Sequence, residues 1–336
     1  MIAVSGASGL VGSHVVLRLL SAGHAVRAQY RNPGHLDEVK RVFGYYGREG
    51  DFDRVEWFQA DLLDPTAAEA LLEGTQGLVH CAALVSFHAR DRALLLNTNP
   101  VQTRNVVNAA LEIPDFHLVH LSSVAALGRS EHGEAGVVLD EKAEWKDDVA
   151  NSTYGLSKFL AENEVWRGME EGLRACILNP GIVIGPGFWD RGGSSGLMGL
   201  VHRGFPYYSP GATGFVDVND LAEAIALVLE QGEHGRRFVM VNEHWPYKQL
   251  MDTMARHLGV APPRKQAQVW QVHLVRLAQA LRERLGGPKA SITRETAASA
   301  FRTTQYSARL FSETFRFTFR PLEACIEEYA GYFLKK

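Results

Sequence analysis

The stretch Gly6-Ala7-Ser8-Gly9-Leu10-Val11-Gly12 decides the fold of this chain. The apolar run Ile2-Ala3-Val4 precedes it and a helical pattern of apolar residues over positions 15–20 follows it, which gives the order strand, glycine-rich turn and helix. Glycines allow a tight turn and a close approach of the backbone to an anion, and the new helix directs its free N–H groups at that anion. The stretch therefore predicts a pyrophosphate site lined by Gly6, Ser8, Gly9, Leu10, Val11 and Gly12.

The composition is that of a globular protein with a sizeable core. The chain has 336 residues, 46% hydrophobic and 22% charged, and a formal net charge of -3. No long basic or acidic block favours nucleic acid or an anionic membrane, so we expect neither as a partner. The three widely spaced cysteines, Cys81, Cys176 and Cys325, indicate reduced thiols in a cytoplasmic protein and no metal site. A first strand at Ile2 leaves no room for a signal peptide, and no apolar run approaches the roughly 20 residues of a membrane span.

Strands and helices alternate along the first half of the chain. We expect further strands at 25–30, 55–59, 78–83 and 117–121, with helical segments between them. This alternation predicts an α/β fold, a Rossmann doubly wound parallel sheet with helices on both faces. The predicted dinucleotide-binding domain covers 1–180, with about 214–245 returning to it. A smaller, mostly helical C-terminal substrate or lid domain covers 181–213 and 246–336.

The end of the second strand bears on the type of dinucleotide. An acidic residue there accepts hydrogen bonds from the adenosine ribose of NAD, whereas an arginine accommodates the extra phosphate of NADP. No acidic residue ends this strand, and Arg31 follows Tyr30 directly. NADP(H) is therefore favoured, with NAD(H) as the alternative and Arg27 as a weaker second phosphate ligand. Asp61, after the third strand, is placed to meet the adenine amino group, and the small residues Cys81, Ala82 and Ala83 leave room for a cofactor at the end of the fourth.

A tyrosine and a lysine four residues apart are the candidate chemical groups. Tyr154 and Lys158 fall on one face of a predicted helix. A lysine ammonium beside a phenol favours the phenolate, which predicts a lowered pKa for Tyr154 and proton exchange near neutral pH. Ser123, at the end of the fifth strand, could orient a substrate oxygen. Tyr-x-x-x-Lys alone is a weak signal, but behind a nucleotide-binding turn and a strand-ending serine it indicates catalysis.

With these residues in place, the chain resembles the extended short-chain dehydrogenase/reductase superfamily, in its epimerase/dehydratase and dihydroflavonol-reductase-like branch. The resemblance runs from Ile2 to about Gly259 and covers several motifs of that superfamily. They are the glycine-rich turn, Asp61-Leu62-Leu63-Asp64, the helix 99–106 with Gln102 in place of a glycine, the serine segment 121–128, Tyr154 and Lys158, the turn 179–187, and the segment 215–222 with Asp217 and Asn219 as departures.

The resemblance implies hydride transfer between a nicotinamide and a substrate carbonyl or alcohol. Tyr154 would be the general acid or base, Lys158 would tune it and hold the nicotinamide ribose, and Ser123 would polarise the carbonyl. The resemblance also implies a homodimer, formed through the helix near 93–111 and the helix that carries Tyr154. Further cofactor contacts would come from Asp61, Leu62, Cys81, Ala82, Ala83, Asn99, Leu121, Ser122, Pro180, Gly181, Ile182 and Val183.

Three functions are compatible with these motifs. The first is reduction of a ketone or aldehyde with NADPH, the second is epimerisation of a nucleotide sugar with NAD, and the third is a non-catalytic nucleotide-binding regulator. A complete set of Ser123, Tyr154 and Lys158 argues against the third. Val124-Ala125 replaces the acidic pair of sugar-nucleotide dehydratases, and Arg31 favours exchangeable NADPH, so we favour reduction.

The substrate side is less defined by sequence. Phe87 follows the fourth strand, and Phe188 and Trp189 open a glycine-rich segment to 210, so these aromatics and Ser123 are the candidate substrate contacts. Positions 266–285 predict an amphipathic helix. The basic residues Arg282, Arg284 and Lys289 are compatible with a membrane-surface helix, but we favour a lid or core-packing helix because acidic and neutral residues interrupt the polar face.

Overall fold

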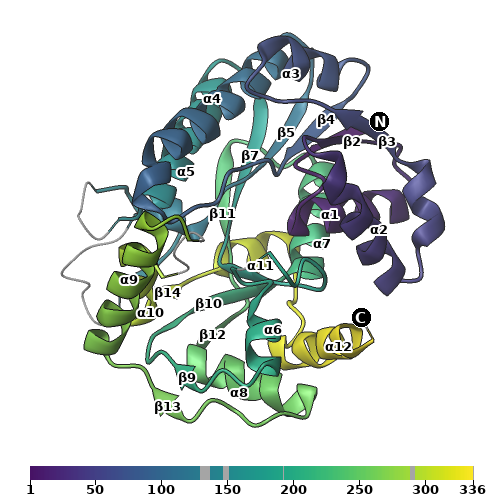
Figure 1. Cartoon of the computed structure of the whole chain (residues 1–336). Helices are drawn as coiled ribbons and strands as arrows, with labels where there is room; N and C mark the ends of the chain where they lie inside the picture. Colours follow the sequence, from purple (N-terminus) through teal and green to yellow (C-terminus); the bar gives the residue numbers. More distant parts are fainter. Residues whose placement is uncertain (129–136, 147–150, 192, 288–291, 336) are drawn as a thin grey trace.

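A computed structural model describes residues 1–128, 137–146, 151–191, 193–287 and 292–335 (Figure 1). Within these residues, seven parallel strands form one sheet in the order β3-β2-β1-β4-β5-β7-β11. The strands are β1 (Ile2–Ser5), β2 (Val26–Tyr30), β3 (Glu56–Gln59), β4 (Gly77–His80), β5 (His117–Leu121), β7 (Arg174–Pro180) and β11 (Arg236–Met240). This sheet confirms the predicted Rossmann fold, and the strand order reverses between β1 and β4, where such sheets bind their ligands.

Helices cover both faces of the sheet (Figure 1). Along β4, Leu78 belongs to the apolar core under one helix layer and Val79 to the core under the other, because successive strand residues point to opposite faces. One layer consists of α3 (Pro65–Leu72), α4 (Arg92–Leu111) and α5 (Thr153–Glu170), and the other of α1 (Leu10–Ser21), α2 (Leu36–Tyr45), α7 (Val218–Gln231) and α11 (Arg309–Phe315).

The start of α3 shows how local sequence sets an element boundary. Asp64 caps the helix by accepting a hydrogen bond from the backbone N–H of Thr66 at 3.0 Å, and Pro65 occupies the first helical position. A proline there costs nothing, because its missing N–H would have no partner within the helix. The pair Asp64-Pro65 is therefore a local signal for the start of a helix at this position.

A second, smaller unit contains a sheet as well as helices. β8 (Ile182–Ile184) and β12 (Glu243–Pro246) flank β10 (Ala212–Asp217), and α6 (Leu197–His202), α8 (Tyr247–Leu258) and α12 (Leu322–Leu334) share an apolar core with it. Two short strand pairs join β9 (Tyr207–Tyr208) to β13 (Lys265–Gln266) and β6 (Val138–Leu139) to β14 (Gln305–Tyr306). The chain crosses between the two units several times. β10 and β12 belong to the small sheet, whereas α7 packs against the large sheet and β11 is one of its strands.

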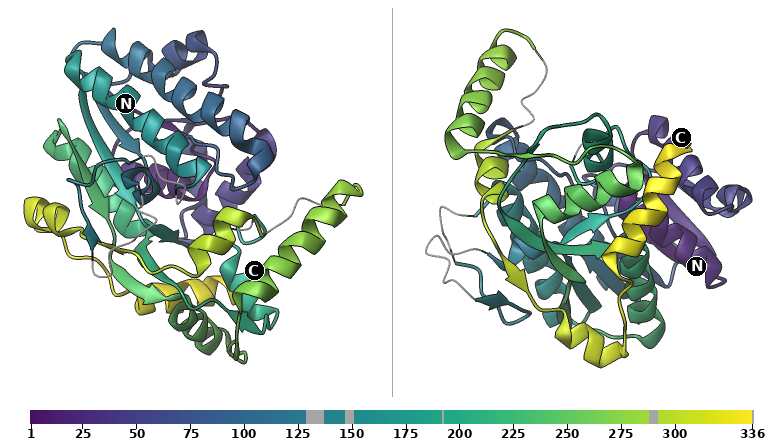
Figure 2. Two further views of the ribbon diagram at one scale, coloured as in Figure 1. Left: turned by 90° about the vertical axis from the view of Figure 1, so that its left-hand side faces the viewer. Right: turned by 90° about the horizontal axis from the view of Figure 1, so that it is seen from below.

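The predicted amphipathic helix is α9 (Val269–Arg284), followed by α10 (Arg294–Ala300), and it projects from the body of the protein (Figure 2). None of the residues of α9 is buried, so the core-packing interpretation is wrong. Amphipathic spacing predicts a helix with an apolar face but does not say which way that face points. Lys289 lies outside the described residues. Among the helices of the described ranges, none is both long and apolar enough to cross a bilayer.

Candidate active site

The glycine-rich turn between β1 and α1 has the geometry of an anion site. Gly6 has a φ of 63°, and a Cβ on it would lie 2.7 Å from the backbone of Ala82. A Cβ on Gly12 would lie 2.3 Å from the carbonyl oxygen of Gly6. At Gly9 the nearest atom to a Cβ would be 3.4 Å away, so the fold itself does not require this glycine. No side chain caps the N-terminus of α1, which leaves its first N–H groups for a ligand such as a pyrophosphate.

Gln29 braces this turn, and sequence reasoning missed it. Its side chain is buried in β2, where it accepts a hydrogen bond from the Gly6 N–H at 2.9 Å and donates one to the Ala60 carbonyl at 2.6 Å. The turn is thereby tied to the ends of β2 and β3, which lie on one side of β1. A glutamine within a predicted central strand was the available signal, because a buried amide needs partners.

The two arginines proposed for an extra phosphate have different environments. Arg27 is engaged, since it pairs with Glu56 at 2.7 Å and donates to the Glu73 carbonyl at 2.6 Å. Arg31 is exposed just beyond β2, and among the described residues its guanidinium makes no hydrogen bond or ion pair. Only Arg31 therefore keeps its donors for a ligand.

The first two residues of the motif Asp61-Leu62-Leu63-Asp64, expected at the adenine, differ in exposure. Asp61 is exposed and accepts a hydrogen bond from the Leu63 N–H at 3.1 Å. Leu62 is buried in the core, and its carbonyl accepts a hydrogen bond from Asn105 at 2.9 Å. The carboxylate of Asp61 thus remains accessible, while the position of the segment is set by Asn105 on α4.

Two amides on α4 hold the loop that follows β4, where Cys81, Ala82 and Ala83 lie. The buried Asn99 accepts a hydrogen bond from the Leu84 N–H at 2.7 Å and donates to Ser157 at 2.9 Å. Gln102, in place of the glycine of related sequences, donates to the Ala82 carbonyl at 2.9 Å. Both side chains position the loop at the switch point, and Asn99 uses its amide for the protein itself.

Ser123, Tyr154 and Lys158 meet beside this loop. The Ser123 hydroxyl hydrogen-bonds the Tyr154 phenol, and the ring of Phe87 stands edge-on to Tyr154 with centroids 5.5 Å apart. Lys158 is buried and donates its Nζ to the carbonyl of Leu121 at 2.6 Å. A Cβ on Gly155 would lie 2.7 Å from the Ala125 carbonyl, so this glycine lets α5 approach the end of β5 closely enough to bring the three groups together.

The protonation of these groups differs from the prediction. Burial raises the pKa of Tyr154 above its usual value, and the hydrogen bond with Ser123 opposes the rise only in part. The ammonium of Lys158 donates a hydrogen bond to the Leu121 carbonyl, and the interaction that lowers the pKa of Tyr154 is the one with Ser123. Burial lowers the pKa of Lys158 itself to about 8, against the attraction of Glu162 and Cys81. At neutral pH the site therefore offers a phenol that can donate a proton.

Glu162 is the second residue that sequence reasoning missed. It lies four positions after Lys158, on the face of α5 that carries Tyr154 and Lys158. Its buried carboxylate accepts hydrogen bonds from Ser122 and, at 2.6 Å, from Asn179, and it pairs with Arg237 at 3.4 Å. The Ser122 hydroxyl consequently points at Glu162. The repeat of Tyr154, Lys158 and Glu162 at intervals of four was the signal for a shared helix face.

A model of the NAD dependent epimerase/dehydratase family matches residues 2–241. The chain belongs to this family. It is 27% identical to a "Putative dihydroflavonol 4-reductase" of Synechocystis sp. (strain ATCC 27184 / PCC 6803 / Kazusa) over 80% of this chain and 75% of that protein. It is 30% identical to "Cinnamoyl-CoA reductase 1" of Petunia hybrida over 71% of this chain and 72% of that protein. The solved structure of the protein named gox2253 superposes with a TM-score of 0.78 and 28% identity, covering 100% of this chain and 98% of that chain.

Membership confirms that the chain is an NAD(P)-dependent enzyme of the epimerase, dehydratase and reductase type within the extended short-chain dehydrogenase/reductases. Pro180 ends β7, and Gly181 joins it to β8, which begins with Ile182 and Val183. A Cβ on Gly181 would lie 2.4 Å from the Gly214 carbonyl, so the glycine allows β8 to pair with β10 at this crossing between the two sheets.

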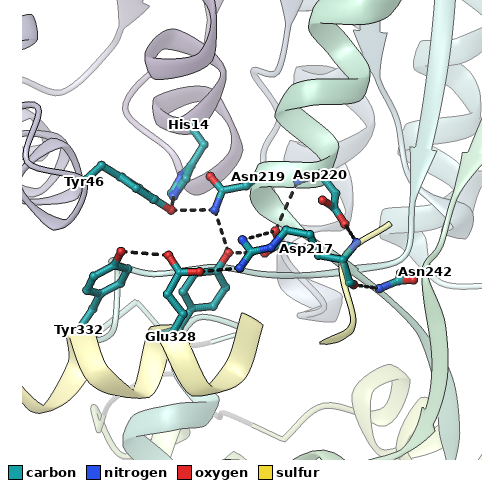
Figure 3. Close-up of polar contacts among 10 residues, drawn as sticks. His14, Tyr46, Asp217, Asn219, Asp220, Asn242, Glu328 and Tyr332 are labelled. Atoms are coloured by element: carbon teal, nitrogen blue, oxygen red, sulfur yellow. Dashed lines mark hydrogen bonds and ion pairs between the residues drawn. The ribbon is translucent and has the colours of Figure 1, made fainter. Parts of the chain in front are cut away.

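The two departures from the family segment 215–222 join one polar network (Figure 3). The buried Asp217 accepts a hydrogen bond from the Tyr329 hydroxyl. Asn219 donates to the hydroxyls of Tyr46 at 3.0 Å and Tyr329 at 2.9 Å, and His14 contacts Tyr46 at 3.1 Å. The departures therefore connect α12, through the start of α7 and Tyr46, to α1, the helix that follows the glycine-rich turn.

The network continues around Asp220, at the start of α7 (Figure 3). Asp220 accepts a hydrogen bond from the backbone N–H of Arg320 at 2.8 Å, and burial raises the pKa of Asp220 to about 7. The guanidinium of Arg320 pairs with Glu328 at 2.6 Å, and Glu328 also accepts a hydrogen bond from Tyr332 at 2.9 Å. The segment before α12 is thus tied to the start of α7, while the apolar face of α12 packs in the core of the smaller unit.

Phe188 and Trp189, expected at the substrate, are buried in apolar cores. Phe188 packs in the core under α1 and α7, and the guanidinium carbon of Arg191 lies 4.7 Å from its ring centroid. Trp189 packs in the core of the smaller unit and donates to the Tyr45 hydroxyl at 3.0 Å. The structure does not bring either residue to Tyr154, whereas it does bring Phe87 there.

The histidines of β4 and β5 are buried and packed. His117 contacts the Glu233 carbonyl at 2.9 Å, and His80 contacts Ser5 at 2.7 Å and Thr103 at 3.1 Å. Burial lowers the pKa of His120 well below its usual value, so its ring is neutral. Among the described residues, no group of histidine, cysteine, aspartate and glutamate side chains is arranged to hold a metal ion.

Proposed function

We propose that the protein is an NADP(H)-dependent reductase of a ketone or aldehyde. The observation that carries this proposal is the meeting of Ser123, Tyr154 and Lys158 at the switch-point edge of the sheet, with Phe87 against the tyrosine ring. A proton donor, an orienting hydroxyl and an apolar wall are what a carbonyl substrate needs.

The chain's own residues would act on the substrate oxygen. Bound NADPH would supply the hydride. Tyr154 would donate its phenolic proton to the developing alkoxide, and its raised pKa keeps this proton on the phenol at neutral pH. Ser123 would donate a hydrogen bond to the carbonyl oxygen, and Lys158 would hold the nicotinamide ribose hydroxyls. Because the phenol is protonated at neutral pH, Tyr154 is in the form that donates a proton during reduction.

The preference for NADPH rests on Arg31. Its guanidinium is exposed at the end of β2 and offers a planar donor set that matches a phosphate. The relatives whose names include dihydroflavonol reductase and cinnamoyl-CoA reductase support reduction over epimerisation. The homodimer remains a prediction, which sedimentation of the purified protein would test.

Nicotinamide fluorescence tests the proposal. NADPH and NADH are titrated against purified protein, and the protein is analysed for nucleotide retained through purification. We expect exchangeable NADPH with tighter binding than NADH, followed by NADPH consumption with members of a panel of ketones and aldehydes. Tightly retained NAD with turnover of a nucleotide sugar would instead identify an epimerase, and dinucleotide binding without turnover of either panel would identify a regulator.

Arg31→Ser is expected to weaken NADPH binding by about 10- to 100-fold and to leave NADH binding nearly unchanged. The reason is the loss of charge-assisted hydrogen bonds to the extra phosphate, at about 1.5–3 kcal/mol. Arg104→Ser, on the exposed side of α4, is the matched control with the same change in charge. Equal weakening of NADPH and NADH, or the same effect in both variants, would remove Arg31 from the cofactor site.

Glu162→Gln is expected to move the alkaline limb of the pH profile of kcat/KM to lower pH by roughly one unit. The carboxylate of Glu162 raises the pKa of Lys158, which burial lowers. His80 and His120 are buried beside Lys158 but neutral, and Cys81 is a thiol whose pKa burial raises to about 12, so Glu162 is the anion that keeps the lysine charged. The variant is therefore expected to lose activity at pH 8 to 9 and to keep most of it near pH 6.5.

Glu164→Gln is the control for this variant. Glu164 lies on the same helix but pairs with Arg167, at 3.1 Å, and does not face the site. We expect it to leave the pH profile unchanged. Uniform loss of activity at every pH in Glu162→Gln would indicate a purely structural role for the carboxylate.

A further inference from the structure

The outward face of α9 is apolar. Trp270, Leu274, Leu277 and Leu281 follow one another at intervals of four, three and four residues, which places them in one stripe along the helix. Their exposed fractions are 63%, 56%, 49% and 60%. We call these four residues the outer stripe. Soluble proteins expose single apolar side chains routinely, but a continuous row that includes a tryptophan marks a binding surface.

Within the described residues, the polar contacts that join α9 to the rest of the chain come from the opposite face. Gln279 accepts a hydrogen bond from the Ile292 N–H at 3.0 Å, and Glu283 pairs with Arg90 at 3.0 Å. These two residues are also four apart, about half a helical turn around from the outer stripe. The orientation of the helix is thus set by polar contacts that turn its apolar side outward, and Figure 2 shows α9 extending from the body.

Basic residues surround the outer stripe. Residues 264–287 contain five of the 35 lysines and arginines of the chain and one of its 38 acidic residues. The acidic one is Glu283, which faces inward to Arg90. This segment therefore carries a formal charge of +4 in a chain whose net charge is -3. The net charge of the whole chain gave no reason to expect an anionic membrane as a partner. It does not show the local excess of basic residues in this segment.

We propose that α9 binds the surface of an anionic lipid bilayer, with the outer stripe inserted among the acyl chains and the surrounding basic residues at the headgroups. The exposed Arg282 and Arg284 near the end of the helix, and Arg264 and Lys265 before it, are complementary to negative headgroups. A helix with an aromatic and leucine face and flanking arginines lies in the plane of such an interface. A projecting helix can reach a flat surface without a matching groove.

The position of α9 connects this surface with the candidate active site. Arg90, the partner of Glu283, follows Phe87 by three residues. On α10, Glu295 accepts hydrogen bonds from the backbone N–H and the hydroxyl of Thr153, both at 3.1 Å, and Thr153 directly precedes Tyr154. A protein docked through α9 would hold the entrance beside Phe87 and Tyr154 close to the bilayer, where apolar carbonyl compounds concentrate.

Vesicle sedimentation tests the proposal without cofactor or substrate, so its failure is separate from a failure of the reductase assignment. The full chain is mixed at low salt with vesicles of phosphatidylglycerol and phosphatidylcholine, or of phosphatidylcholine alone. We expect binding to the anionic vesicles that weakens at high salt. The double variant Leu274→Glu/Leu281→Glu is expected to lose at least about 100-fold in binding, and Arg282→Gln/Arg284→Gln about tenfold.

Leu334→Glu is the matched control, because Leu334 is 53% exposed at the end of α12 and outside the outer stripe. It is expected to bind vesicles as the wild type does, and unchanged thermal unfolding of all variants shows that they are folded. Absence of binding to anionic vesicles at low salt overturns the proposal. So does a dimer that Leu274→Glu/Leu281→Glu dissociates without any vesicle binding, since the outer stripe would then cover a second copy.

Discussion

Tyr154→Phe is expected to reduce turnover by about 10²- to 10⁴-fold while leaving NADPH binding close to that of the wild type. The phenolic hydroxyl is the only group lost, and general acid catalysis by a positioned side chain contributes a factor of this size. The Phe87 contact involves the ring and is retained in the variant. Steady-state NADPH consumption gives the turnover, and nicotinamide fluorescence gives the binding.

Tyr332→Phe is the control that makes the same chemical change elsewhere. It removes a hydroxyl that donates to Glu328 in the network beside α12, far from Ser123 in the fold. We expect normal turnover and a loss of about 1 kcal/mol in the free energy of unfolding. A Tyr154→Phe enzyme with near-native turnover would remove the tyrosine from the mechanism, and with it the assignment of the general acid.

The large sheet and its helices could be predicted because their signals are local. The run Ile2-Ala3-Val4, the glycines and the following helical period occupy one short stretch, and Asp64-Pro65 marks a helix start within two residues. Burial of a parallel strand on both faces demands a continuous apolar run, which is visible without the tertiary structure. The same holds for the four-residue spacing of Tyr154 and Lys158.

The polar supports of the site could not be predicted, because their partners are distant in sequence. Gln29 reaches Ala60, 31 residues away, and Glu162 reaches Ser122, 40 residues away. Each side chain is a plausible surface residue until the fold buries it. For the same reason the predicted lowering of the pKa of Tyr154 is wrong. The spacing places Lys158 on the same helix face as Tyr154, but it does not show that the Lys158 ammonium donates a hydrogen bond to the Leu121 carbonyl.

For apolar side chains outside the sheet, the sequence does not show whether they point into the core or outward. Phe188 and Trp189 stand in a glycine-rich segment, and sequence alone does not tell whether such aromatics pack inward or face a ligand. The outer stripe of α9 presents the reverse case, in which an amphipathic period typical of a core-facing helix belongs to a helix without buried residues. In both cases the tertiary contacts, such as Glu283 with Arg90, decide the outcome.

Gly9→Val is expected to abolish dinucleotide binding, with a loss of at least about 100-fold, and to leave thermal unfolding nearly unchanged. Gly9 has an extended backbone, with φ at -104° and ψ at 173°, which a β-branched residue adopts readily. A Cβ there would meet no protein atom closer than 3.4 Å. The side chain would instead occupy the approach to the uncapped start of α1, where two lost charge-assisted hydrogen bonds would account for such a factor. Fluorescence titration and thermal unfolding measure the two quantities.

Two other glycines make this experiment decisive. Gly12→Val is expected to prevent folding, because its Cβ would lie 2.3 Å from the Gly6 carbonyl oxygen, whereas Gly50→Val has open space and is expected to change neither binding nor stability. Gly9 is thus a glycine that the ligand requires, whereas Gly12 is one that the fold requires. Wild-type NADPH affinity in Gly9→Val would mean that the pyrophosphate does not lie on this turn, and the cofactor site would have to be sought elsewhere in the chain.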